Sequence, residues 1–211
     1  MKAQIWLTGF EPFGHHSENP SQQLVERLLH TSRTHHIKQT VNELALGPVE
    51  LTFSGTILSV DEAGSRLSSE HLGDIDAIVH VGLHEISEII RFEMCATNEC
   101  NFRIPDNSGR QISETPIVES GEPQLYTTAD HHSIANAFSG NDHVIMSDDC
   151  GRFVCNETYY RTLHSIKERE LGPGGSTLPA IFVHIPSFNH IPAANQLDIL
   201  CTLCAHIVQK F

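Results

Sequence analysis

Short apolar runs alternate along this chain with longer stretches in which apolar residues recur every three or four positions. The short, branched runs are typical of buried strands, and the longer spacing is typical of helices that bury one side. Strands are predicted over residues 4–8, 77–82, 143–146 and 179–184, with strand-like patterns over 36–59 and 89–97. Helices are predicted over residues 19–29, 60–72, 128–138, 153–169 and 193–210.

Strands that alternate with helices indicate an α/β fold with helices on both faces of the sheet. The chain has 211 residues, which suits one domain with one core, and it shows neither an internal repeat nor a linker. We therefore predict a single-domain α/β/α sandwich over residues 1–211, with a mostly parallel twisted central sheet.

The composition excludes several classes of partner. The formal net charge is -13, which argues against binding to a nucleic-acid backbone. No apolar run approaches the ~20 residues that span a bilayer, and the apolar stretch at the N-terminus is too short for a signal peptide. We expect a cytoplasmic protein with no nucleic-acid or membrane partner.

Six cysteines are present, and in a chain of this length without an export signal we expect them to be free thiols. Cys201 and Cys204 have the spacing of metal ligands, but they lie in an apolar helical run without a second cysteine pair. We interpret them as core residues, and we expect no metal and no cofactor.

One cysteine stands at a position that favours reactivity. Cys155 follows the predicted strand 143–146 and lies near the start of the predicted helix 153–169, with Gly151 permitting a tight turn between them. Ser147, Asp148 and Asp149 are candidate N-caps for this helix. Unpaired N–H groups and the helix dipole favour a thiolate there, so Cys155 is a candidate nucleophile; a small buried hydrophobe is the alternative.

Other segments follow predicted strands and are expected at the same edge of the sheet. They are the loop 9–14, the residues from Leu83 onward, and His184, which ends the strand 179–184 ahead of Pro186. A cysteine nucleophile needs a base, and His184 is the candidate. A third group would orient the imidazole, and Asp148, Asp149 and Glu93 are the candidates by position.

Four segments together resemble the motifs of the pyrrolidone-carboxylate peptidase family, also called pyroglutamyl peptidase I. They occur in the family's order across nearly the whole chain: Gly9-Phe10-Glu11-Pro12-Phe13-Gly14 with Asn19-Pro20-Ser21, Arg103-Ile104-Pro105-Asp106-Asn107, Ser147-x-x-x-Gly151-x-x-x-Cys155-Asn156, and Val183-His184-Ile185-Pro186. The family has a single-domain α/β/α fold and a Cys-His-Glu triad.

The resemblance implies a role for each matching residue. Cys155 is the nucleophile, His184 the base and Glu93 the third member of the triad. Arg103 lies near the site and supports the oxyanion, for which a surface ion pair is the alternative. Phe10 and Phe13 form aromatic walls around the pyroglutamyl ring, although ordinary core packing is the alternative for both.

The implied activity is hydrolysis of the amide bond after an N-terminal pyroglutamyl residue of peptides or proteins. The implied partner is the pyroglutamyl peptide substrate. Because bacterial members of the family often form oligomers, the resemblance also implies self-association as a dimer or tetramer. Two alternatives are a non-catalytic metal- or ligand-binding protein on the same scaffold and a cysteine hydrolase of another cyclic amide.

Three positions depart from the family's pattern. Residues 83–87 read Leu-His-Glu-Ile-Ser where many members have a glycine-rich segment. Met94 replaces the arginine that often follows the glutamate, and Cys150 stands where a small alanine is usual.

Overall fold

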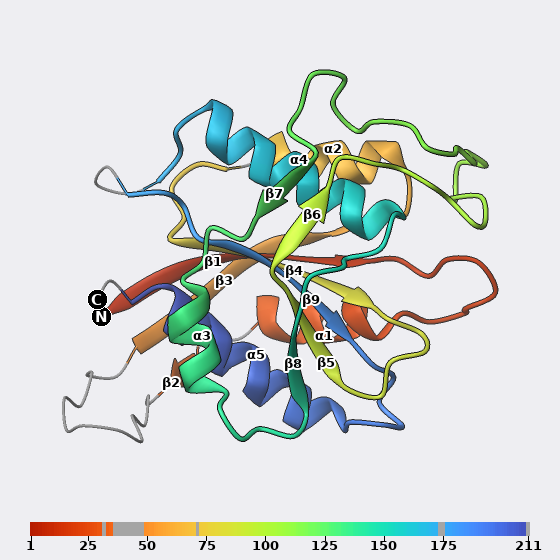
Figure 1. Cartoon of the computed structure of the whole chain (residues 1–211). Coiled ribbons are helices and arrows are strands. Elements are labelled where there is room, and N and C mark those ends of the chain that lie inside the picture. Colours follow the sequence, from red (N-terminus) through yellow and green to blue (C-terminus); the bar gives the residue numbers. More distant parts are fainter. Residues whose placement is uncertain (31–32, 36–48, 71, 173–175, 210–211) are drawn as a thin grey trace.

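The structure is a computed structural model that describes residues 1–30, 33–35, 49–70, 72–172 and 176–209. A seven-stranded sheet runs through its centre in the order β2-β3-β1-β4-β9-β5-β8 (Figure 1). Its strands are β1 (Lys2–Phe10), β2 (Arg33–His35), β3 (Val49–Leu58), β4 (Ala77–Leu83), β5 (Ile90–Glu93), β8 (Val144–Ser147) and β9 (Ala180–Ile185). A second sheet pairs β6 (Cys95–Thr97) with β7 (Gln124–Tyr126).

Helices cover both faces of the large sheet, as the pattern predicted (Figure 1). Their bounds are α1 (Pro20–Leu29), α2 (Glu62–Glu70), α3 (His131–Ala137), α4 (Val154–Glu168) and α5 (Ala193–Ile207). Apolar side chains of α1, α3 and α5 form one core with the sheet. Apolar side chains of α4 form the second core, and Leu67 of α2 packs against it. The prediction of an α/β/α sandwich is confirmed.

The sheet is mostly parallel, with two exceptions that matter for the site. Strands β3, β1, β4 and β9 run parallel, whereas β2 is antiparallel to β3 and β5 is antiparallel to β9. Because β8 is parallel to β5, it also runs against β9. The carboxyl end of β8 therefore does not lie at the edge where β1, β4 and β9 end, and the expectation that it does is wrong.

Several predicted elements differ in detail from the observed ones. The predicted strand 89–97 is divided into β5 and β6 at Met94, and the pattern missed β7. The segment 143–146 was expected to be a buried strand, but β8 is an edge strand in which Ile145 is 38% exposed. Within 36–59, residues 36–48 lie outside the described part of the chain.

The cysteines behave as the sequence predicted. All six are free thiols, and Cys201 and Cys204 are buried in the apolar side of α5. Within the described residues, no helix has the length and apolar character needed to cross a membrane.

One buried histidine ties the sheet to α4. His80 on β4 is fully buried, and its Nδ1 lies 2.7 Å from the Thr8 hydroxyl while its Nε2 lies 3.0 Å from the Thr162 hydroxyl. A neutral ring can donate through one nitrogen and accept through the other, so both hydroxyls are satisfied. Burial lowers the pKa of His80 from 6.5 to about 3, so the ring is neutral in the folded protein.

The lowered pKa predicts a pH-dependent stability. The stabilisation due to neutral His80 is present above pH 6.5 and is lost as the pH falls towards 3, because only the unfolded chain binds the proton. By pH 5 this effect should lower the free energy of unfolding by about 2 kcal/mol relative to neutral pH. Urea unfolding of wild-type and His80→Gln proteins at pH 7 and pH 5 measures it. The loss between the two pH values should be smaller in His80→Gln, whereas His132→Gln, which changes an exposed histidine, should match the wild type.

Candidate active site

Cys155 lies in the first turn of α4, above the end of β4. Gly151 has a φ of 77°, a left-handed conformation that suits glycine, and the segment 148–153 returns the chain from β8 to the sheet edge. An added Cβ at Gly82 would lie only 3.1 Å from the Cys155 sulfur, which shows how closely the thiol approaches β4. Cys155 therefore lies at the predicted edge because the segment 148–153 leads back to it, although β8 itself runs away from that edge.

The start of α4 carries no side-chain cap within the described residues. Its N-cap is Phe153 in an extended conformation, so the expectation of a cap from Ser147, Asp148 or Asp149 is wrong. The first N–H groups of a helix have no partner inside the helix, and the dipole adds a positive potential there. Because no side chain caps this helix start, its first N–H groups can donate hydrogen bonds to an anion near Cys155.

His184 and Glu93 meet across the antiparallel pair of β9 and β5. In the register Arg91 lies opposite His184 and Glu93 lies opposite Phe182, so the alternating side chains of both strands share one face. The His184 Nδ1 lies 2.8 Å from the Glu93 carboxylate, and both side chains are buried. Of the three acidic candidates, Glu93 is thus the one at the imidazole, because Asp148 and Asp149 are exposed.

The surroundings favour a charged imidazole. Burial alone would lower the pKa of His184, but its hydrogen bonds with Cys155 and Glu93 outweigh that effect and raise the pKa to about 9. At neutral pH the ring is then an imidazolium between the sulfur of Cys155 and the carboxylate of Glu93. A cation in that position stabilises a thiolate.

Two residues that the sequence did not single out hold Glu93 in place. Arg91 Nε lies 3.3 Å from the Glu93 carboxylate, and its Nη2 donates to the Ser147 hydroxyl at 2.7 Å. The hydroxyl of Tyr159 on α4 donates to the Glu93 carbonyl oxygen at 3.2 Å. The two-residue spacing between Arg91 and Glu93 was a usable signal, because alternate residues of a strand share a face.

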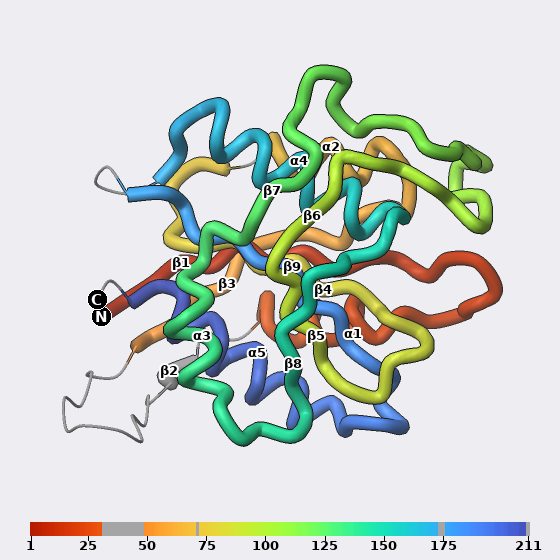
Figure 2. Tube along the Cα trace, in the orientation of Figure 1, coloured from red at the N-terminus to blue at the C-terminus, as the bar shows by residue number. Residues whose placement is uncertain are grey.

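A small pocket lies beside the sulfur, between the loop after β1, the end of β4 and the start of α4. The backbone trace shows the loops that follow β1 and β4 on the same side of the molecule (Figure 2). Apolar side chains dominate its lining, which consists of Phe10, Phe13, Asn19, Val60, Leu83, Phe153, Val154 and Cys155. Phe10 is only 2% exposed and also belongs to the core, whereas Phe13 is half-buried and its ring lies 6.0 Å from that of Phe153. Both predicted aromatic residues are at the pocket, and Phe153 is a third that the sequence reasoning missed.

Arg103 makes no observed bond to this group within the described residues. Its side chain is exposed, and within the described residues no hydrogen bond or ion pair joins it to Cys155, His184 or Glu93. The same motif acts through Asn107, whose side-chain amide donates to the Glu11 carboxylate at 2.8 Å and so braces the loop after β1. A role for Arg103 in supporting the oxyanion stays a prediction.

The departures from the family's pattern lie around the site. His84 packs edge-on against His184 with ring centroids 5.4 Å apart, and burial together with nearby positive charge lowers the pKa of His84. Met94 points into the core on the other face of the sheet, and Cys150 is buried near α4. The rebuilt segment 83–87 therefore touches the base through His84.

A thiol at a helix start, an imidazole and a carboxylate on an α/β/α scaffold define the class of cysteine-dependent hydrolases. The model of the pyroglutamyl peptidase family matches residues 3–204, and the chain belongs to this family.

Named relatives share this assignment. Pyrrolidone-carboxylate peptidase of Klebsiella pneumoniae is 33% identical over 185 residues, which cover 87% of this chain and 78% of that protein. The protein of the same name from Vibrio parahaemolyticus is 28% identical over 184 residues with the same coverage. Among solved structures, pyroglutamyl peptidase I from Bacillus amyloliquefaciens has a TM-score of 0.77 at 23% identity, covering 100% of this chain and 97% of its own. A variant of pyrrolidone carboxyl peptidase from Pyrococcus furiosus has a TM-score of 0.77 at 21% identity, covering 97% and 98%.

The site geometry predicts which thiol reacts first. Cys155 is half-buried, whereas the other five cysteines are buried. Burial raises the pKa of Cys95, Cys150 and Cys204, and it raises that of Cys100 to about 12. Timed alkylation at neutral pH with peptide mapping should label Cys155 about tenfold faster or more than any other cysteine.

Pyroglutamic acid should slow that labelling by filling the pocket beside the sulfur, and proline amide, which lacks the lactam carbonyl, is the matched control. Faster labelling at one of the five buried cysteines, without protection by the lactam, would contradict an activated Cys155.

Proposed function

We propose that this protein is a cysteine peptidase that hydrolyses the amide bond after an N-terminal pyroglutamyl residue, with Cys155, His184 and Glu93 as its catalytic triad. The observation that carries the proposal is the buried chain of contacts from Glu93 through His184 to Cys155, at the mouth of an apolar pocket. Membership of the pyroglutamyl peptidase family supports the choice of substrate.

The pocket suits a neutral ring. Pyroglutamate is a lactam without a charged amine, so apolar walls and a few hydrogen bonds are enough to bind it. Phe13, Phe153 and Leu83 supply apolar surface, and the Asn19 side chain is a polar group among the lining residues. A free N-terminal glutamate or glutamine would bring an ammonium group into this pocket, and its desolvation would be costly.

The reaction then proceeds in two halves. The Cys155 thiolate attacks the carbonyl carbon that follows the lactam ring, and the N–H groups at the start of α4 stabilise the oxyanion. The His184 imidazolium gives its proton to the leaving amine as the carbon–nitrogen bond breaks, which leaves an acyl-enzyme. Neutral His184 next takes a proton from water, the hydroxide attacks the thioester, and pyroglutamate leaves as Cys155 regains its thiolate.

Glu93 is a positioning residue in this scheme. It holds the Nδ1 side of His184, which directs Nε2 at the sulfur and the leaving group, and its negative charge favours the imidazolium. Arg91 and Tyr159 hold Glu93 in turn. We further propose that the protein acts in the cytoplasm as a dimer or tetramer, as expected from its family.

Hydrolysis of a pyroglutamyl fluorogenic amide tests the activity and the roles. Cys155→Ser should abolish turnover, His184→Ala should lower kcat/KM by about 10³-fold or more, and Glu93→Gln should lower it less. Circular dichroism and urea unfolding show whether each variant keeps the fold. Cys150→Ser is the matched control, since it removes the neighbouring thiol and should keep most of the activity.

Activity lost in Cys150→Ser but kept in Cys155→Ser would contradict the nucleophile. Near-normal turnover in His184→Ala would assign the base to another histidine. Activity on other cyclic amides, with none on the pyroglutamyl substrate, would favour a different hydrolase.

The raised pKa of His184 predicts the alkaline limit of the reaction. The leaving amine needs a proton from the imidazolium, so kcat/KM should persist through neutral pH and fall as the pH rises through about 9. Glu93→Gln removes one of the interactions that raise this pKa, so its fall should begin at lower pH. Glu88→Gln changes an exposed carboxylate and should leave the profile in place. An unchanged alkaline limb in Glu93→Gln would contradict the coupling of Glu93 to His184.

A further inference from the structure

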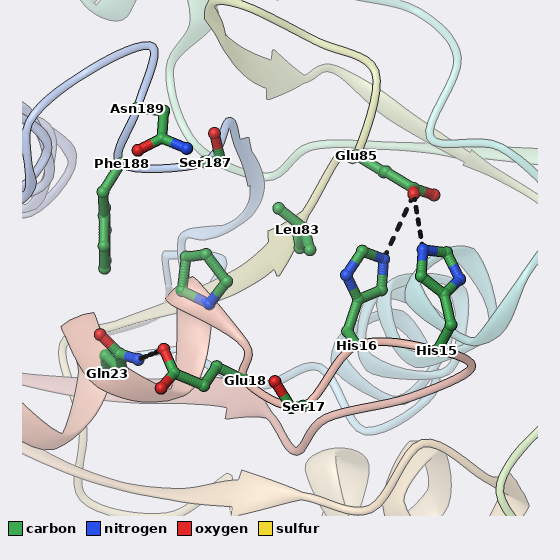
Figure 3. A pocket seen from close by; sticks show the side chains of 11 residues that line it. His15, His16, Ser17, Glu18, Gln23, Leu83, Glu85, Ser187, Phe188 and Asn189 are labelled. Carbon is green, nitrogen blue, oxygen red and sulfur yellow. Dashed lines mark hydrogen bonds and ion pairs between the residues drawn. The ribbon is translucent and has the colours of Figure 1, made fainter.

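Two histidines and a carboxylate gather where the loop after β1 meets the loop after β4 (Figure 3). His15 and His16 both direct Nε2 at the same oxygen of Glu85, at 3.3 and 3.4 Å. One ligand atom from each of the three residues lies within 4.8 Å of the other two. We propose that this His15–His16–Glu85 cluster binds a divalent transition-metal cation such as Zn²⁺.

The ligand types fit such a cation. Neutral imidazole nitrogen together with a carboxylate oxygen is a donor set that Zn²⁺ accepts, with water in the remaining position. The three residues of the cluster line a hollow together with Glu18, which adds a second carboxylate. The chain also carries a formal net charge of -13, so the surroundings attract cations.

The spacing of the ligand atoms also fits. Tetrahedral zinc with bonds of about 2.0–2.1 Å places neighbouring ligand atoms roughly 3.3–3.4 Å apart. Both distances from the Glu85 oxygen already have this value. The two imidazole rings lie 4.2 Å apart by their centroids, and His15 is 78% exposed, so its ring can turn towards the cation with little loss of packing.

Without a cation, the cluster is incompletely satisfied. The Nε2 atom of His16 is shielded from solvent, and its approach to Glu85 is too poorly aligned to be a hydrogen bond, so it has no hydrogen-bond partner among the described residues. A shielded polar atom without a partner is costly. A bound cation would take the lone pair of this nitrogen and remove that cost.

The position of the cluster gives the cation a consequence for activity, which rests on the proposed function. The His16 ring packs against Phe13 with centroids 5.5 Å apart, and Leu83 lines both the hollow beside the cluster and the pocket beside Cys155. A cation would therefore link the two loops that frame the substrate pocket. A linked pair of loops opens less readily, so the cation should slow turnover reversibly.

Zinc binding tests the site by itself. Titration calorimetry of untagged full-length Cys155→Ser protein avoids coordination by the reactive thiol, and one equivalent of Zn²⁺ should bind. His15→Gln or Glu85→Gln in this background should weaken that binding by at least about 100-fold, because loss of an outer-shell group alone already costs 10–100-fold. The matched control is His131→Gln with His132→Gln, which removes another exposed pair of adjacent histidines whose rings lie 3.9 Å apart.

Unchanged affinity in His15→Gln and Glu85→Gln, or loss of binding in the His131–His132 control, would overturn the site. Absence of any zinc binding to the Cys155→Ser protein would overturn it as well.

Inhibition tests the consequence, in protein that keeps Cys155. Zn²⁺ should slow hydrolysis of the pyroglutamyl amide, and a chelator should restore the rate. His15→Gln should raise the half-inhibiting concentration about 100-fold or more, in proportion to its weaker binding. Equal inhibition of His15→Gln and wild type would place the inhibiting ion on the thiol and overturn the linkage of the loops. Because the calorimetry needs no turnover, a protein without peptidase activity would refute the proposed function and leave the metal site to be judged by its own measurement.

Discussion

The arrangement depends on one buried hydrogen bond, between His184 Nδ1 and the Glu93 carboxylate at 2.8 Å. A carboxylate with no exposed surface is strongly destabilised unless it is paired and hydrogen-bonded. The imidazolium provides the main compensation and the Arg91 guanidinium adds to it. The same carboxylate keeps His184 charged, so the interaction that permits burial of Glu93 also prepares the base.

That hydrogen bond exists because β5 inserts antiparallel beside β9. A parallel strand would need a long crossover and would present a different edge to His184. The antiparallel register sets Arg91 opposite His184 and Glu93 two residues further on, on the same face. Gly82 lies on β4, on the other side of β9, and its lack of a side chain leaves room for the sulfur of Cys155. A Cβ added at Gly82 would lie 3.1 Å from that sulfur and 2.8 Å from the Phe182 ring. The strands on both sides of β9 thus complete the site.

The local pattern of apolar residues was sufficient to predict the helices that bury one side. The helices that carry Pro20–Leu29, Val154–Glu168 and Ala193–Ile207 were predicted to within a few residues, because the spacing of their apolar residues is set by the helical repeat. It also placed Cys155 at a helix start and His184 at a strand end. These are properties of one segment, which a sequence displays directly.

Local pattern was insufficient where the answer lies in the pairing of distant segments. The choice of Glu93 over Asp148 and Asp149 depends on β5 lying beside β9, more than eighty residues apart in the chain, and no local spacing encodes that pairing. The resemblance to the family supplied it. The same limit explains why the direction of β8 was wrong, since a short apolar run has the same appearance in either direction.

The rigid and the variable parts of the site therefore have different origins. His184 and Glu93 stand on strands whose side-chain directions are fixed by hydrogen-bonded neighbours, so a change of loop sequence leaves their separation intact. The loop residues 83–87 depart from the family's pattern, yet they alter what surrounds the base and the pocket rather than the pairing of His184 with Glu93. Two features come from this change of loop sequence: His84 packs edge-on against His184, and Glu85 lies beside two histidines. A scaffold that confines its chemistry to strands can acquire new ligands at its loops without rebuilding the reaction it already performs.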